Sequence, residues 1–222
     1  MGINKGDKTK VRVIVADDHQ IVRVGLRAML EKSGDIEVVA EAANGRAAVE
    51  AVRNLSPDVV IFDISMPDLN GIEATRQIHV ASPGVKVIAL SAHSDQRFVV
   101  GMLEAGASAY LLKTCSFEEL TYAIHCVINN QAYLSPDVAN TVIKDYVSGG
   151  HLGHTASSLT NREREVLQLM AEGRNTKDIA LNLNLSVKTV EAHRQRIMDR
   201  LNIHNVAELT KYAVREGLTP LE

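Results

Sequence analysis

The stretch DVVIFD (Asp58–Asp63) is a short apolar run, rich in β-branched residues, that Pro57 precedes and an aspartate ends. Similar runs flank it on both sides: VRVIVA (Val11–Ala16), IEVVAE (Ile36–Glu41), VKVIALS (Val85–Ser91) and AYLLK (Ala109–Lys113). Unbroken apolar runs of this length are typical of strands that are buried on both faces of a sheet. The sequence therefore predicts a central sheet of five strands.

Segments with helical periodicity separate these runs. We expect helices over residues 19–32, 46–55, 72–80, 96–105 and 117–129, where apolar residues recur three and four positions apart. Strands that alternate with helices predict an α/β fold with a doubly wound, five-stranded parallel sheet.

The remainder of the chain has no strand pattern. Ser135-Pro136 favours the start of a short helix that runs to about Val147. The Gly- and Ser-rich segment Ser148–Ser158 indicates a flexible linker. Four short helices are expected after it, with capping residues at Thr160, Thr176, Ser186 and Asn205. We therefore divide the chain into an α/β domain (9–133), a linker with one short helix (134–156) and a small all-α domain (157–222).

Composition narrows the class of protein. The chain has 222 residues, 45% of them apolar, which is enough for one large core or two small ones. Two cysteines cannot form a disulfide framework, and no apolar stretch approaches the 18 residues of a membrane span. We expect a soluble, cytoplasmic protein with no membrane partner. Residues 1–147 carry a net charge of −4 and residues 155–222 a net charge of +1. This difference is compatible with a nucleic-acid-binding surface in the second segment.

The residues at the ends of the predicted strands carry the chemistry. Asp17 and Asp18 follow the first strand, Asp63 ends the third, Ser91 the fourth and Lys113 the fifth. Ligands of parallel α/β sheets bind beyond the carboxyl ends of the strands, so these side chains are expected to form one site. Three carboxylates suit a hard cation such as Mg²⁺, and a carboxylate can also accept a phosphoryl group. A single aspartate here is often only a helix cap, but the placement at four strand ends favours a site.

Residues 11 to about 130 resemble the receiver domain of two-component response regulators, through VIVADDH, DISMPDLNG, ALSAH and AYLLK in that order. The resemblance implies a flavodoxin-like fold in which a sensor histidine kinase phosphorylates Asp63. It also implies that Mg²⁺ or Mn²⁺ binds Asp17, Asp18, Asp63 and the backbone carbonyl of Ser65. Ser91 and Lys113 would contact the phosphoryl group, and Tyr110 would be the switch aromatic. Many receivers have proline after this lysine, where the present chain has Thr114.

A helix-turn-helix is indicated near the carboxyl end by Thr176–Leu183, a turn at Asn184-Leu185, and Val187–Leu201. At 100° per residue, the last helix separates an apolar stripe from a polar face; the stripe contains Val190, Ile197 and Leu201, and the face Lys188, Glu191, Ala192 and Gln195. Gln can read adenine, Glu can accept from cytosine, and Ala can contact the thymine methyl group. An isolated solvated face would have the same composition, but the turn favours DNA recognition.

Residues 159–218 also resemble the LuxR-type DNA-binding domain, through LTNREREVLQLMAEG, NTKDIA and LSVKTVEAHRQRIMDRLNI. Together with the receiver, this is the layout of NarL/FixJ-type transcriptional regulators. The expected contacts to double-stranded DNA are Thr176, Lys177, Lys188, Thr189, Glu191, Ala192, Arg194, Gln195 and Arg196. The last helix resembles the family's dimerisation helix, with Val206, Leu209 and Ala213 as candidate contacts, although ordinary core packing would use the same residues. We expect phosphorylation to promote a homodimer on DNA, with RNA polymerase as a further candidate partner.

Other classes of function fit less well. A haloacid-dehalogenase-like phosphatase could use Asp63 as its nucleophile, but that class needs a second aspartate two residues later, where this chain has Ser65. A dinucleotide-binding domain needs glycines after the first strand, and this loop has none. A helical domain that binds protein instead of DNA stays open as an alternative. We expect a regulator that is not an enzyme.

Overall fold

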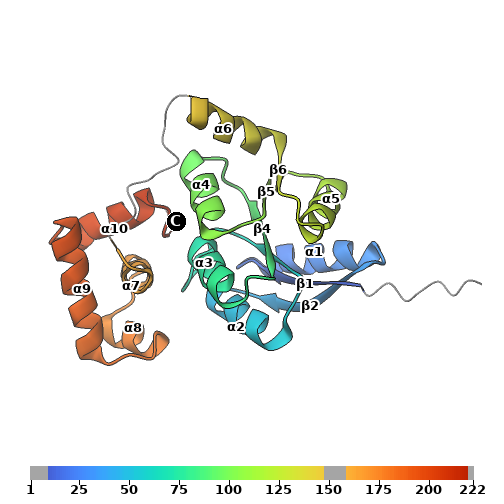
Figure 1. Ribbon diagram of the computed structural model, residues 1–222. Helices are drawn as coiled ribbons and strands as arrows, with labels where there is room; N and C mark the ends of the chain where they lie inside the picture. The colour runs from blue at the N-terminus through green and yellow to red at the C-terminus, as the bar shows by residue number, and fades with distance from the viewer. Residues whose placement is uncertain (1–9, 148–158, 220–222) are drawn as a thin grey trace, which may run out of the picture.

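The computed structural model describes residues 10–147 and 159–219, which form an α/β domain (10–147) and a helical domain (159–219) with separate cores (Figure 1). Within these residues the sheet has six parallel strands, in the order β2-β1-β3-β4-β5-β6. They are β1 (Val11–Ala16), β2 (Ile36–Ala42), β3 (Val59–Phe62), β4 (Lys86–Ser91), β5 (Ala109–Leu112) and β6 (Tyr133–Leu134). The predicted flexible segment Ser148–Ser158 lies outside the described residues.

Helices cover both faces of the sheet, as the doubly wound prediction requires (Figure 1). On one face lie α1 (Gln20–Lys32) and α5 (Phe117–Ile128), and on the other α2 (Gly45–Leu55), α3 (Gly71–Ala81) and α4 (Gln96–Ala105). Successive residues of β1 alternate between the two cores: Val13 and Val15 pack with α1 and α5, while Ile14 packs with the opposite layer. Each such fully buried aliphatic side chain contributes about 1.5–3 kcal/mol, which explains why the strands read as unbroken apolar runs.

The sixth strand corrects the prediction of five. Tyr133 and Leu134 pair in parallel with Ala109 and Tyr110 of β5. Two residues are too few to produce a periodic pattern, so the sequence gives no strand signal there. The next helix, α6 (Pro136–Val147), begins and ends where predicted. It packs against the α/β domain with Val138 fully buried, so this domain extends beyond the predicted boundary at residue 133.

The helical domain contains α7 (Asn161–Ala171), α8 (Thr176–Asn182), α9 (Val187–Leu201) and α10 (Val206–Arg215). Thr160 forms a capping box with Glu163, and Ser186 and Asn205 cap the helices that follow them, as predicted. The predicted cap at Thr176 is wrong, because the side chain of Asn175 accepts the backbone N–H groups of residues 177 and 178. Asparagine is as good a cap as threonine or better, so the boundary moves by one residue.

The two domains lie against each other through α7 and the end of α10, while α9 lies on the side of the helical domain away from the sheet (Figure 1). None of the helices in the described part of the chain has the length and apolar character that crossing a bilayer requires.

Candidate functional site

Acidic side chains gather at the carboxyl ends of β1 and β3. Asp17 and Asp18 follow β1, and Asp63 follows β3. These residues lie close together because the two strands are parallel neighbours, so their carboxyl ends are side by side. One ligand atom from each of these residues and from His19 lies within 4.8 Å of the others. Sequence reasoning brought the three aspartates together correctly but missed His19. Its Nδ1 atom lies 2.7 Å from Oδ1 of Asp18, and its place directly after the acidic pair was the available signal.

Lys113 joins this acidic cluster from the end of β5. Its Nζ atom donates to Oδ2 of Asp17 at 2.7 Å and lies 3.1 Å from Oδ2 of Asp63. Burial alone would lower the pKa of Lys113, but the hydrogen bond to Asp17 and the charge of Asp63 outweigh it and raise that pKa. The lysine is therefore held as a cation beside the carboxylates. The peptide bond to Thr114 is trans.

Asp63 is the second buried carboxylate beside this lysine, and it follows β3 directly. It is only 6% exposed, and its Oδ1 atom accepts the backbone N–H of Ile64 at 2.8 Å. Burial raises the pKa of Asp63, as does the charge of Asp17, while the charge of Lys113 lowers it; the net direction is upward. Glycine at the start of α3 is needed here, since a Cβ atom on Gly71 would collide with the carbonyl oxygen of Asp63. A buried carboxylate with one cation beside it is suited to accept an electrophile.

Ser91 and Tyr110 are linked through His93 in the loop after β4. The backbone N–H of His93 donates to Oγ of Ser91 at 3.0 Å, and the hydroxyl of Tyr110 donates to the carbonyl oxygen of His93 at 2.6 Å. Both Ser91 and Tyr110 are fully buried. Burial raises the pKa of Tyr110 to about 12, so its hydroxyl stays protonated and remains a donor. Ser91 and Tyr110 therefore both bind the backbone of one loop, the loop that follows β4.

The acidic cluster fits a divalent cation. Its donors are carboxylate oxygens of Asp17, Asp18 and Asp63, the hard ligands that Mg²⁺ and similar ions prefer. Asp17 is 2% exposed and Asp63 6%, while Asp18 is exposed, so the set is open to solvent on one side. A cation there can bind both protein oxygens and those of an incoming group.

The candidate DNA-reading face of α9 is free of contacts with the α/β domain among the described residues. Six of the predicted contact residues are exposed, namely Lys177, Lys188, Glu191, Ala192, Gln195 and Arg196. Thr176, Thr189 and Arg194 are partly buried, and Arg194 donates to Oγ1 of Thr176 at 2.8 Å, which ties α9 to α8. The turn between them is stabilised by Asn184, whose φ of 53° is in the left-handed region.

The candidate dimer contacts on α10 divide into two groups. Leu209 is 1% exposed and Ala213 0%, and both belong to the core of the helical domain, so neither is available to a partner in this conformation. Val206 is 46% exposed and remains accessible. The apolar pattern of a helix cannot by itself distinguish a dimer contact from a core contact, which explains the difference.

Sequence reasoning missed one set of residues altogether. Arg164, Glu165 and Gln168 of α7 contact the α/β domain and are largely buried against it. They recur three and four positions apart, but a polar stripe of this kind is usually solvated. Nothing in the sequence alone indicates that a second domain covers them.

Comparison with known proteins agrees with the two-domain geometry. Residues 13–125 match the response regulator receiver domain, and residues 157–213 match the bacterial regulatory proteins of the luxR family. The response regulator UvrY of Escherichia coli (strain K12) is 37% identical over 212 residues, covering 96% of this chain and 97% of UvrY. The oxygen regulatory protein NreC of Staphylococcus epidermidis (strain ATCC 12228 / FDA PCI 1200) is 37% identical, covering 94% of this chain and 99% of NreC.

A solved structure is similar over the same extent. It shows RcsB from Salmonella enterica serovar Typhimurium bound to promoter rprA in the presence of phosphomimetic BeF3⁻. It is 27% identical, has a TM-score of 0.57, and covers 92% of this chain and 98% of that chain. The receiver match, the luxR match and relatives that align over nearly the whole length lead to one conclusion. The chain belongs to the NarL/FixJ-type response regulators, transcription regulators that join a receiver domain to a LuxR-type DNA-binding domain.

Proposed function

We propose that Asp63 accepts a phosphoryl group from a sensor histidine kinase, and that this event controls binding of the helical domain to specific DNA sites. The observation that carries the proposal is the position of Asp63. It is buried at the end of β3, 3.1 Å from the Lys113 ammonium and in one cluster with Asp17 and Asp18.

The reaction at Asp63 is a phosphoryl transfer from a phosphohistidine. A carboxylate oxygen of Asp63 attacks phosphorus as the N–P bond breaks, and the electron pair of that bond remains on the imidazole nitrogen, which takes up a proton. Asp17, Asp18, Asp63 and the backbone carbonyl of Ser65 would hold Mg²⁺ or Mn²⁺, which supplies neutralising charge for the phosphoryl oxygens. The Lys113 ammonium lies 3.1 Å from Asp63 and can neutralise further negative charge on the phosphoryl oxygens.

The phosphoryl oxygens are strong acceptors and attract the Ser91 hydroxyl. A shift of Ser91 withdraws the acceptor of the His93 N–H, and Tyr110 can then leave the His93 carbonyl and move inward. The aspartyl phosphate thus biases the loop after β4 through two hydrogen bonds.

On the DNA side, Lys188, Glu191, Ala192 and Gln195 of α9 enter the major groove, and Thr176, Lys177, Thr189, Arg194 and Arg196 contact phosphates. A net charge of +1 over residues 155–222 gives one domain weak electrostatic affinity, so binding of two half-sites by a homodimer is the effective form. Val206 of α10 is the accessible candidate for the dimer contact. With DNA as its target and RNA polymerase as a further partner, the protein acts in the cytoplasm.

The test is labelling with a phosphorylated histidine kinase or acetyl phosphate, with Mg²⁺ present. Asp63→Asn is expected to abolish labelling, because an amide is not a nucleophile toward phosphorus. Asp95→Asn is the matched control: Asp95 is an exposed aspartate beside the same edge and makes no side-chain cap, so this variant keeps the label. Persistent labelling of Asp63→Asn would refute the assignment.

A second measurement tests whether phosphorylation controls DNA binding. Bound sequences are selected from a random pool with and without phosphodonor. We expect enrichment of a repeated or palindromic site that depends on the donor, and this would separate a DNA-binding domain from one that binds protein.

A further inference from the structure

A carboxylate orients the amide of Gln195 on the outer face of α9. The Nε2 atom of Gln195 donates to the Oδ1 atom of Asp199 at 2.8 Å, four residues further along the helix, and both side chains are exposed. An ionised carboxylate only accepts hydrogen bonds, so the nitrogen end of the amide must face Asp199. The Oε1 atom and the second N–H of Gln195 are therefore left for another partner.

The groups of Gln195 that remain match the major-groove edge of adenine. Adenine presents its N6 amino donor beside its N7 acceptor, and glutamine reads this pair with its oxygen and one N–H. An amide nitrogen carries two N–H bonds, so the one given to Asp199 leaves the other for N7. If the amide turned by half a rotation, its oxygen would face the carboxylate oxygen of Asp199, and two acceptors repel each other. Asp199 therefore favours the orientation that reads adenine.

A second carboxylate lies one turn before Gln195 and keeps its oxygens free. Glu191 is exposed and makes no side-chain hydrogen bond or ion pair with any other described residue. It lies four residues from Gln195, as Asp199 does, yet the amide donates to Asp199. Glu191 can therefore accept from the amino group of cytosine. At a rise of about 1.5 Å per residue, the two acceptors lie about 6 Å apart along the helix, or about two base-pair steps.

The position of Asp199 is unfavourable for the helix itself. It lies in the last turn of α9, where the negative end of the helix dipole repels a carboxylate. Among the described residues, no lysine or arginine forms an ion pair with it to offset this cost. Its one side-chain hydrogen bond is the bond to Gln195. Residues that contradict local preferences in this way are expected at functional positions.

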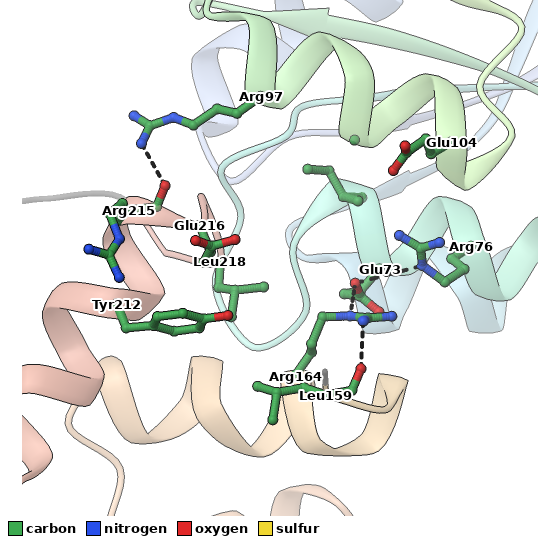
Figure 2. Close-up of a pocket in the computed structure, with 12 residues that line it drawn as sticks. Glu73, Arg76, Arg97, Glu104, Leu159, Arg164, Tyr212, Arg215, Glu216 and Leu218 are labelled. Carbon is green, nitrogen blue, oxygen red and sulfur yellow. Dashed lines mark hydrogen bonds and ion pairs between the residues drawn. The ribbon is translucent and has the colours of Figure 1, made fainter. Parts of the chain in front are cut away.

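The face that carries these side chains is accessible. The cavity of about 470 Å³ between the two domains is lined by residues of α3, α4, α7, α10 and the segments beside them, and by none of α9 (Figure 2). The backbone of α9 is held from its other side, because Ser186 caps the helix and Arg194 donates to Oγ1 of Thr176 in α8. The amide of Gln195 and the carboxylate of Glu191 are thus presented on a fixed helix.

We infer that Asp199 is a positioning residue for base recognition: it holds Gln195 so that α9 presents two acceptors, and the half-site carries adenine and cytosine where they meet the DNA. The inference rests on the proposed function and specifies the class of DNA sequence. Both bases present an amino group in the major groove, whereas guanine and thymine present acceptors there and are disfavoured. Asp199 acts through Gln195 and does not touch a base.

The experiment is selection of binding sites from a random pool by the phosphorylated full chain, followed by affinities for every single-base variant of the selected site. Wild type is expected to select adenine at one position and cytosine about two base pairs away. Asp199→Ala is expected to lose about fivefold or more of the adenine preference and to keep the cytosine preference, because only the amide is released. The preference is a ratio of affinities, so a general gain in affinity from the loss of one negative charge cancels.

Glu216→Ala is the matched control. It removes the same charge from an exposed position of the helical domain, at the interdomain cavity and not on α9, so its base preference stays that of wild type (Figure 2). Asp199→Glu returns a carboxylate within reach of the amide and is expected to restore the adenine preference. In a Gln195→Ala background, Asp199→Ala is expected to change the preference no further, because its effect passes through Gln195.

Three results would overturn the positioning role. One is an adenine preference as strong in Asp199→Ala as in Glu216→Ala, with the helix content of both variants matched by circular dichroism. Another is an effect of Asp199→Ala that persists in the Gln195→Ala background. The third is guanine or thymine at the position that Gln195→Ala relaxes. Failure of phosphorylated wild type to enrich any common sequence would instead contradict the proposed function.

Discussion

The ammonium nitrogen of Lys113 lies 3.1 Å from the Oδ2 atom of Asp63, although α3, β4, α4 and β5 lie between the two residues in the chain. Burial raises the pKa of Asp63, and the charge of Lys113 is the largest influence that lowers it. The ion pair therefore favours the ionised form of this shielded carboxylate and partly offsets the effect of burial. Removal of the lysine tests this directly.

Lys113→Met is expected to raise the pKa of Asp63 further, because the opposing attraction is lost. The measurement is a ¹³C NMR titration of the Asp63 carboxyl group in EDTA. Lys144→Met, at an exposed lysine of α6, should leave the titration unchanged. Equal midpoints for wild type and Lys113→Met would show that the ion pair has no electrostatic role.

The same shift has a consequence for stability. Since the folded pKa of Asp63 lies above that of the unfolded chain, ionised Asp63 costs folding free energy at pH values above its folded pKa. That cost disappears as the pH falls from the folded pKa to the unfolded one. The window widens in Lys113→Met, so thermal unfolding in EDTA should show this variant gaining more stability than wild type on acidification across it.

A divalent cation is expected to stabilise the receiver domain through the acidic cluster. A cation that binds the folded chain and not the unfolded one raises the unfolding midpoint roughly in proportion to the logarithm of its concentration, and this is the expected effect of Mg²⁺. Asp17→Asn should lose most of this increase, because Asp17 supplies a buried oxygen ligand. Glu50→Gln, at an exposed glutamate of α2, should retain it. Thermal scans with Mg²⁺ and with EDTA decide the matter, and an undiminished increase in Asp17→Asn would exclude it as a ligand.

Two neighbouring residues of α9 are expected to contribute differently to DNA binding. Gln195 is exposed on α9, and its Nε2 atom donates to Asp199 at 2.8 Å in the free chain. In the proposed complex this side chain faces the groove. Gln195→Ala should relax base preference at one position, by about 1–3 kcal/mol of discrimination. Arg196→Ala should weaken binding to all sequences and reduce the salt dependence by about one phosphate contact. Affinities for a panel of single-base variants at several salt concentrations separate the two effects; identical profiles would contradict the division.

Gly217 and Gly173 form a pair that isolates the interdomain contact. Both have positive φ, 70° and 78°, so alanine at either position costs about 1 kcal/mol of backbone strain. A Cβ atom on Gly217 would lie 2.5 Å from Cε1 of Phe98, whereas one on Gly173 meets nothing within 4 Å. Gly217→Ala should therefore lower the unfolding midpoint more than Gly173→Ala and increase the radius of gyration. If the two variants behave alike, the packing of Gly217 on Phe98 is energetically unimportant.

The sequence predicted which side chains gather at the carboxyl ends of the strands, because strand ends are fixed by simple rules. Parallel strands place Asp17, Asp63, Ser91 and Lys113 at one edge whatever the details of packing, so the order of motifs was sufficient. His19 was missed because a histidine at the start of a helix has no periodic signature. The two-residue strand at Tyr133 was missed because it is defined by its pairing with β5 and not by its own composition.

Contacts between the domains could not be predicted in the same way. Gln168 and Arg164 have ordinary helical spacing and polar side chains, and only the approach of another domain makes them buried. Leu209 and Ala213 show the converse problem, since an apolar helix face is equally suited to a core and to a partner chain. In both cases the deciding fact is which surface comes near, and a single sequence does not contain it.

The outward position of α9 has a consequence for the cell that contains this protein. If α9 reads the groove as proposed, a helix whose outer face is exposed among the described residues lets single molecules encounter the chromosome and sample it before any stimulus. Basal promoter occupancy then depends on copy number, and the stimulus changes how long pairs of molecules remain at a site. Overproduction alone should therefore mimic part of the signalled response.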